Sequence, residues 1–270
     1  MNHLQLLIHV VAKLRDPENG CPWDLQQTAQ SLCRFILEEA YETVEAIESK
    51  NDDAIKDELG DLLFQVVLQS QIASEANVFD LEQVAAAVSE KLIRRHPHVF
   101  ADEQVSDAEQ QSLRWEQVKR QERALANNSD ASVLDGVSGT LPAMTQAIKL
   151  QQRAASVGFD WKSITPIFDK VMEELEETRA EVNARNQDAI EDEIGDLFFA
   201  VTNLARHAGI DPETSLRRSN AKFAKRFRVL EQQLRDQGLD ISSASQEELE
   251  QLWQLVKRHM TDTSTQAQQD

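Results

Sequence analysis

The sequence predicts an all-α protein built from two tandem helical-bundle modules, and three observations lead to this prediction. Gly and Pro number only 8 and 6 among 270 residues, below their usual shares of roughly 7% and 5%, so few positions suit hairpin turns. Apolar residues recur every three or four positions over most of the chain, which is typical of amphipathic helices. One helical pattern also occurs twice in the chain.

Each expected helix follows from its own apolar stripe. In the first half, we expect helices over residues 4–14, 31–49, 52–76, 80–95 and 107–125. Two prolines and a glycine in the segment 16–22 should end the first of these helices. In the second half, we expect helices over residues 143–156, 165–184, 187–207, 211–236 and 245–260.

A change of composition divides the chain. Asn, Ser, Asp and Gly collect in residues 126–142, where Gly136 and Gly139 are two of the eight glycines, and this is typical of a linker. We therefore expect an N-terminal module over 1–125, a linker over 126–142, a C-terminal module over 143–260 and a polar, frayed tail over 261–270.

Composition excludes several classes of function. With 28 Lys+Arg against 47 Asp+Glu, the net charge is −19, which disfavours binding to nucleic acid or anionic lipid. Cys21 and Cys33 cannot form a disulfide framework and suit a reducing compartment. No signal peptide and no membrane-spanning run is recognised in the sequence. We expect a cytoplasmic protein without nucleic-acid or membrane partners.

The repeat carries the acidic motifs. Residues 53–64 match residues 188–199 at an offset of 188 − 53 = 135, and each copy contains the pattern ExGD. An EExxE motif precedes it in both copies, with the second glutamate of EExxE nineteen residues before the glutamate of ExGD. Glutamates three apart share a helix face, so two helices joined by a turn would bring the carboxylates together. The motif residues are Glu38, Glu39, Glu42, Glu58 and Asp61 in the first copy and Glu173, Glu174, Glu177, Glu193 and Asp196 in the second.

Converging carboxylates repel one another and must protonate, turn into water or hold a cation. An all-oxygen ligand set favours a hard ion, Mg²⁺ or alternatively Mn²⁺. Mg²⁺ usually bridges carboxylates to substrate phosphates, so the pattern indicates phosphate-ester or phosphoanhydride chemistry. The ordinary alternative is a solvated acidic face. Gly60 and Gly195 inside the predicted helices are consistent with close approach of a partner helix or a ligand.

Basic and aromatic residues could complete a phosphate site in the second module. Lys222 and Arg226 share a helix face and could clamp phosphates, although a surface pair is an equal alternative. Lys170 precedes Glu174 by one turn and could face the same phosphates. Trp253 and its counterpart Trp115 could stack on a base or be buried, and His96 and His98 are expected in a turn.

These motifs resemble the MazG family of nucleoside triphosphate pyrophosphohydrolases, within the all-α NTP pyrophosphatase superfamily. The resemblance rests on the two EExxE–ExGD patterns and on Gly20-Cys21-Pro22-Trp23-Asp24, Arg95-His96-Pro97-His98, Leu141-Pro142-Ala143, Gly158-Phe159-Asp160-Trp161 and the Lys222–Arg226 stretch. It covers nearly the whole chain. It implies a helical bundle, a homodimer and the hydrolysis of NTP to NMP and pyrophosphate with Mg²⁺, with broad base specificity and water attacking the α-phosphorus.

The resemblance also implies roles for individual residues. Catalysis falls on Glu173, Glu174, Glu177, Glu193 and Asp196, and the last four of these also bind the metal. Further metal ligation falls on Glu39, Glu42, Glu58 and Asp61. Nucleotide binding falls on Lys222, Arg226 and Trp253, to which its position one turn before Glu174 adds Lys170. The second module lacks the CPWD sequence of the first and has Gly158-Phe159-Asp160-Trp161 instead, so the two modules could differ in activity. We favour the second.

Two alternatives stay open on the sequence alone. The first is a non-catalytic protein whose acidic helical faces bind a basic partner. The second is a related all-α hydrolase with narrow specificity, for example for dUTP. No residue pattern in the sequence identifies a base.

Overall fold

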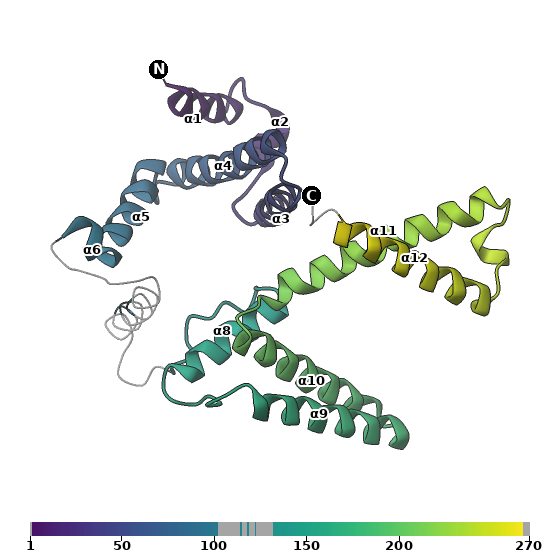
Figure 1. The fold of residues 1–270 in the computed structure, drawn as a ribbon. Coiled ribbons are helices and arrows are strands. Elements are labelled where there is room, and N and C mark those ends of the chain that lie inside the picture. Colours follow the sequence, from purple (N-terminus) through teal and green to yellow (C-terminus); the bar gives the residue numbers. More distant parts are fainter. Residues whose placement is uncertain (1, 102–113, 115–117, 119–121, 123–131, 267–270) are drawn as a thin grey trace. The chain divides into compact units, whose positions relative to one another are not determined.

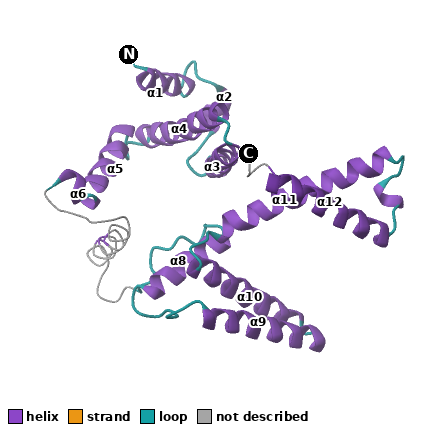
Figure 2. Ribbon diagram, viewed as in Figure 1, coloured by secondary structure: helices purple, strands orange, loops and turns teal. Residues whose placement is uncertain are grey.

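The computed structural model describes residues 2–101, 114, 118, 122 and 132–266. This part of the chain is helical and contains no strand (Figure 2), as the sequence predicted. The chain divides into two compact units, Met1–Ala126 and Asn127–Asp270. Most of the predicted helix over 107–125, including Trp115, lies outside the described residues.

The first unit is centred on a pair of antiparallel helices, α3 and α4 (Figure 1). Its helices are α1 (His3–Leu14), α2 (Pro22–Gln26), α3 (Cys33–Ser49), α4 (Asp52–Glu75), α5 (Leu81–Arg95) and α6 (Pro97–Phe100). α1 packs on α4, and the fully buried Val11, Leu32 and Leu68 form the core between these elements. The core therefore lies on one side of α4.

The second unit repeats this plan with α8, α9 and α10 and adds a long helical pair. Its elements are α8 (Ala143–Ala155), α9 (Thr165–Ala184), α10 (Gln187–His207), α11 (Pro212–Asp236), the 3₁₀ turn η1 (Ile241–Ser243) and α12 (Gln246–Gln266). α11 and α12 pack through Leu230, Leu234 and Val256. α9 and α10 lie side by side in Figure 1.

The same tight turn joins the central pair of helices in both units. α3 ends at Lys50 and α9 at Arg185, each in the left-handed conformation with φ 58°. Asn51 then begins α4 by accepting hydrogen bonds from the Asp53 and Ala54 backbone amides, and Asn186 precedes α10. A two-residue turn leaves the helices antiparallel neighbours, so EExxE on one helix faces ExGD on the other.

Three short helical elements, α2, α6 and η1, were not predicted, and the predicted end of the last helix was wrong. Pro22 and Pro97 begin α2 and α6, because the fixed φ of proline suits the first turn of a helix. His98 therefore lies in α6 and not in a turn. α12 continues to Gln266 and does not end at residue 260, since neither Gly nor Pro interrupts residues 261–266.

Candidate active site

The α9–α10 pair brings three predicted carboxylates of the second unit together. Oxygens of Glu174, Glu177 and Glu193 lie within 4.8 Å of one another. Glu174 is buried, whereas Glu177 is exposed at the rim. Asp196 is outside this group of three, is exposed, and lines the cavity that Glu174 also lines. This arrangement could hold a divalent cation with one face open to a ligand.

The α3–α4 pair of the first unit carries a similar group. Oxygens of Glu39, Glu58 and Asp61 lie within 4.8 Å of one another. Glu42 is exposed and falls outside the group. Each unit thus brings together three of its four predicted metal ligands. The ligand outside the group is Asp196 in the second unit and Glu42 in the first.

Carboxylate crowding changes the acidity of both groups. Partial burial, followed by repulsion from Glu174 and Asp196, raises the pKa of Glu193. Desolvation by the surrounding protein atoms, followed by repulsion from Glu193, likewise raises the pKa of the exposed Glu177. In the first unit the pKa of Glu39 and that of Glu58 are raised by the same causes. Raised values mean that each group favours a proton or a cation over bare charge.

Lys170 partly compensates the charge in the second unit. Its Nζ lies 2.7 Å from Oε1 of Glu174 and 2.9 Å from Oε1 of Glu173. These ion pairs raise the pKa of Lys170, so the ammonium stays charged. The lysine is only partly exposed and lines the cavity. Glu173 is exposed and is not one of the three grouped carboxylates.

The predicted nucleotide-binding residues Lys222, Arg226 and Trp253 do not join the carboxylates within the described chain. Lys222 and Arg226 lie on α11, and Trp253 lies on α12. None of them lines the cavity beside Glu174. Trp253 packs against the α11–α12 core with its ring centroid 5.2 Å from that of Phe223. Arg226 Nε is buried and has no hydrogen-bond partner among the described residues.

The corresponding basic position in the first unit is occupied by an ion pair. Arg95 Nη2 lies 2.5 Å from Oε2 of Glu122, which also pairs with Arg94. The hydrogen bonds from Arg95 outweigh partial burial and lower the pKa of Glu122 to about 2. The rings of His96 and His98 are tilted against each other, with centroids 5.6 Å apart. They are not part of a carboxylate group among the described residues.

Gly60 and Gly195 lie inside α4 and α10, as predicted. Of the two explanations for these glycines, close approach of a partner helix or of a ligand, the first is wrong within the described chain. A Cβ atom added at either glycine would meet no atom of the described chain within 4 Å. Both positions therefore have open space beside the helix.

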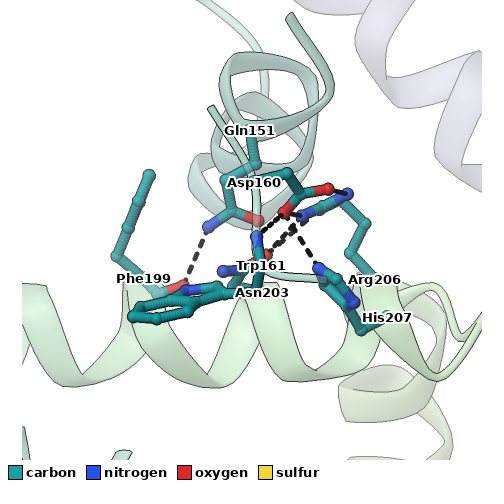
Figure 3. A network of polar contacts seen from close by, with 7 residues as sticks. All are labelled: Gln151, Asp160, Trp161, Phe199, Asn203, Arg206 and His207. Atoms are coloured by element: carbon teal, nitrogen blue, oxygen red, sulfur yellow. Dashed lines mark hydrogen bonds and ion pairs between the residues drawn. The ribbon is translucent and has the colours of Figure 1, made fainter. Parts of the chain in front are cut away.

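Sequence reasoning missed a polar network around Asp160 (Figure 3). Arg206 Nη1 lies 3.0 Å from Asp160 Oδ2, and His207 Nε2 lies 2.9 Å from Asp160 Oδ1. Burial raises the pKa of Asp160, but the hydrogen bonds from Arg206 and His207 lower it more, to about 2. Asp160 belongs to the Gly158–Trp161 motif, but no spacing rule connects it to an arginine 46 residues away.

The network lies on the same cavity as the carboxylates. The cavity has a volume of about 690 Å³ and is lined at one end by Glu174, Lys170 and Asp196 and elsewhere by Asp160, Asn203 and Arg206. A volume of roughly 300–1,000 Å³ is usual for small-molecule sites. In the part of the chain that the structure describes, no helix is long and apolar enough to cross a membrane.

Comparisons with known proteins give matches to both units. Residues 27–100 and 162–229 match the MazG nucleotide pyrophosphohydrolase domain, so each unit contains one match. The chain is 45% identical over 264 residues to the nucleoside triphosphate pyrophosphohydrolase of Escherichia coli K12, covering 97% of this chain and all of that protein.

Two further relatives extend the similarity. The chain is 41% identical over 251 residues to the nucleoside triphosphate pyrophosphohydrolase/pyrophosphatase MazG of Thermotoga maritima, covering 93% of this chain and 94% of that protein. It is 42% identical over 249 residues to the uncharacterized protein YabN of Bacillus subtilis, covering 92% of this chain and half of that protein. Two domain matches and identity along nearly the full length lead to one conclusion: this chain belongs to the MazG nucleotide pyrophosphohydrolase family, with two MazG modules in tandem.

Proposed function

We propose that this protein is a metal-dependent nucleoside triphosphate pyrophosphohydrolase that converts NTP and water to NMP and pyrophosphate. The observation that carries the proposal is the group of Glu174, Glu177 and Glu193 beside a cavity large enough for a nucleotide. The names of the Escherichia coli and Thermotoga maritima relatives support the substrate and the bond that is cleaved.

The donor set fits Mg²⁺, with Mn²⁺ as the alternative, because every grouped ligand is a carboxylate oxygen. The raised pKa values of Glu177 and Glu193 support this proposal, because they make the group unfavourable as bare charge. Glu174, Glu177, Glu193 and Asp196 would hold the ion. When bound, the ion would neutralise phosphate charge and favour ionisation of water.

We assign the remaining steps to residues of this chain. The oxygen of water forms a bond to the α-phosphorus. The bond between the α-phosphorus and the α,β-bridging oxygen breaks, and pyrophosphate leaves with that oxygen. Glu173 would accept the proton of water, and Lys170 would balance the charge of Glu174 and the phosphates. The second module is favoured, because the Arg95 position of the first module is neutralised by Glu122.

We further propose a homodimer, because α9 and α10 carry exposed apolar side chains at helical spacing. These are Phe168, Met172 and Leu175 on α9 and Ile194, Phe198 and Val201 on α10, each at least 38% exposed. Large apolar side chains left exposed in this way are typical of an interface between subunits. Lys222, Arg226 and Trp253 do not line the cavity of their own chain. In the proposed dimer, these residues of one subunit would contact the nucleotide bound to the other subunit. The mass in solution, relative to the 30.6 kDa chain, checks this proposal.

The net charge of −19 supports our prediction that nucleic acid is not a partner. Two free cysteines, Cys21 and Cys33, support the prediction of a cytoplasmic location.

Product identification tests the proposed reaction. The protein is incubated with Mg²⁺ and each of the common NTPs and dNTPs, together with dUTP, and the products are separated. We expect NMP and pyrophosphate from several nucleotides. Release of NDP and orthophosphate would contradict attack at the α-phosphorus. Turnover of dUTP alone would favour the narrow-specificity hydrolase, and no turnover with or without metal would favour the non-catalytic alternative.

A further inference from the structure

The carboxylates account for only one end of the cavity in the second unit. Asp196 and Asn203 both lie on α10 and both line the cavity. Seven residues separate them, which corresponds to roughly 10 Å along a helix. A polyphosphate held at the carboxylates would therefore leave the Asn203 end for another part of the same ligand.

Gln151 on α8 presents an unpaired acceptor at this end. The residue is 7% exposed, and its Nε2 donates a 2.9 Å hydrogen bond to the Phe199 backbone oxygen. This bond settles which end of the amide is nitrogen. Its Oε1 is buried and has no hydrogen-bond partner among the described residues. A buried acceptor without a partner costs free energy, and a donor supplied by a ligand would remove that cost.

Asn203 presents a donor to the same space. Its Oδ1 accepts hydrogen bonds from Arg206, at 3.1 Å from Nε and 2.8 Å from Nη2. Arg206 is itself held by Asp160. Because Oδ1 is engaged, the amide nitrogen is the atom of Asn203 that can donate to a ligand. Figure 3 shows Gln151 reaching from α8 toward the helix that carries Phe199 and Asn203.

Aromatic side chains lie beside this acceptor and donor. Trp161 and Phe199 line the cavity and are 46% and 45% exposed. Flat aromatic rings stack on nucleobases whatever the base sequence. The acceptor and the donor match the polar edge of a base, and the two aromatic rings match its flat face. A sugar has hydroxyl groups that could use the acceptor and the donor, but it has no flat face to stack on the rings.

We propose that the α8–α10 end of the cavity binds the nucleobase, and that Gln151 Oε1 accepts a hydrogen bond from it. This inference rests on the proposed function, because it assumes that the triphosphate lies at the carboxylates. Adenine and cytosine offer an amino group, and guanine and uracil offer ring N–H groups. Every common base can therefore donate a hydrogen bond to Gln151, so this site would accept several nucleotides.

The first unit shows why the base site belongs to the second unit. Arg15 precedes Asp24 by nine residues, as Gln151 precedes Asp160. Arg15 Nη2 lies 2.6 Å from Glu75 Oε2, and Arg15 Nη1 donates to the Asp24 backbone oxygen. A paired arginine at this place offers no acceptor to a base.

Nucleotides that lack a single amino group test the role of Gln151. Purine riboside triphosphate is ATP without its amino group, and pyrimidin-2-one riboside triphosphate is CTP without its amino group. For the wild-type protein we expect a KM about tenfold higher for each analogue, with kcat little changed, as for the loss of one hydrogen bond. In Gln151→Leu the two members of each pair should have equal KM. Gln152→Leu, at the exposed neighbouring position, should discriminate as the wild type does.

Binding measurements separate the base from the phosphates. By calorimetry with Mg²⁺, Gln151→Leu should bind AMP about tenfold more weakly and inorganic tripolyphosphate as the wild type does. If Gln151→Leu fails to fold, Trp161→Ala, at a partly exposed position, should show the same loss for AMP alone. Equal losses for both ligands, or undiminished discrimination in a folded Gln151→Leu, would overturn the proposal.

The two proposals fail in different ways. Absence of pyrophosphate from wild-type reactions would refute the proposed function, whereas AMP binding still tests the base site. Normal pyrophosphate release together with no preference for ATP over its analogue would refute the base site alone.

Discussion

At the scale of single residues, the site depends on a few carboxylates that are crowded but not fully buried. Glu174, Glu177 and Glu193 come within 4.8 Å of one another, and the pKa values of two of them are raised. Lys170 pairs with Glu174 and removes only part of the charge. A divalent cation therefore has both ligands and an electrostatic reason to bind.

Removing one of these carboxylates tests the site most directly. Glu193→Gln keeps the shape of the side chain but removes a charge and a strong metal ligand. We expect kcat to fall by at least about 100-fold, which corresponds to roughly 2.7 kcal/mol, with helicity by circular dichroism unchanged. Glu58→Gln is the matched change in the first module. A large loss of kcat for Glu58→Gln and none for Glu193→Gln would show that the first module carries the activity.

The Asp160 ion pairs give a pH dependence of stability. The folded pKa of Asp160 is about 2, below the ordinary value of 3.8, so the stabilisation is present above about pH 4 and is lost as pH falls toward 2. Asp160→Asn should lower the melting temperature at pH 7, and the difference from wild type should shrink between about pH 4 and 2. Asp169→Asn, at an exposed position on α9, is the control. A difference that is constant over this range would contradict the ion-pair explanation.

At the scale of elements, the site depends on two helices held antiparallel by a two-residue turn. Lys50-Asn51 and Arg185-Asn186 make this turn in both modules. The turn places EExxE opposite ExGD without help from distant segments. The repeat at an offset of 135 residues therefore copies a structural unit and not only a sequence pattern.

The glycines within these helices give a prediction for stability. A Cβ at Gly60 would meet no atom within 4 Å, and Ala has a higher helix propensity than Gly. Gly60→Ala should therefore increase the free energy of unfolding by roughly 0.5–1 kcal/mol, measured by urea denaturation. Gly20→Ala is the contrasting control, because its Cβ would lie 2.5 Å from the Asp16 and Leu14 backbone oxygens. It should destabilise the protein, and a gain there would contradict the geometry.

At the scale of the whole molecule, charge and metal binding are coupled. The chain carries a net charge of −19, and each module has its own acidic group. Any salt reduces the general repulsion, whereas only a bound ion acts through specific ligands. These two effects can be separated by experiment.

Magnesium should raise the melting temperature beyond the effect of salt. A ligand at about 100 times its dissociation constant stabilises the folded state by about 2.7 kcal/mol. We therefore expect a higher melting temperature with MgCl₂ than with NaCl of equal ionic strength, measured by scanning calorimetry. The difference should be reduced in Glu193→Gln and further reduced when Glu58→Gln is added. Equal shifts with the two salts would argue against specific sites.

Much of the fold could be predicted because helices follow from local patterns. Apolar spacing identified the central helices of both modules, and the bounds of α9 and α10 match residues 165–184 and 187–207. The short helices α2 and α6 were not predicted from the sequence. A proline interrupts a preceding helix, but its fixed φ also suits the first turn of a new helix, as at Pro22 and Pro97. The expected division into residues 1–125 and 143–260 stays a prediction.

The all-α class, the tandem repeat and the converging carboxylates could be predicted from local patterns, because residues three or four apart on a helix share a face. In contrast, it is the packing of the helices that brings Gln151, Asp160 and Arg206 to one cavity with Glu174. The same packing leaves Lys222, Arg226 and Trp253 away from that cavity. These relationships depend on how α8, α10 and α11 pack, and no local pattern in the chain specifies the packing of segments that lie far apart in the sequence.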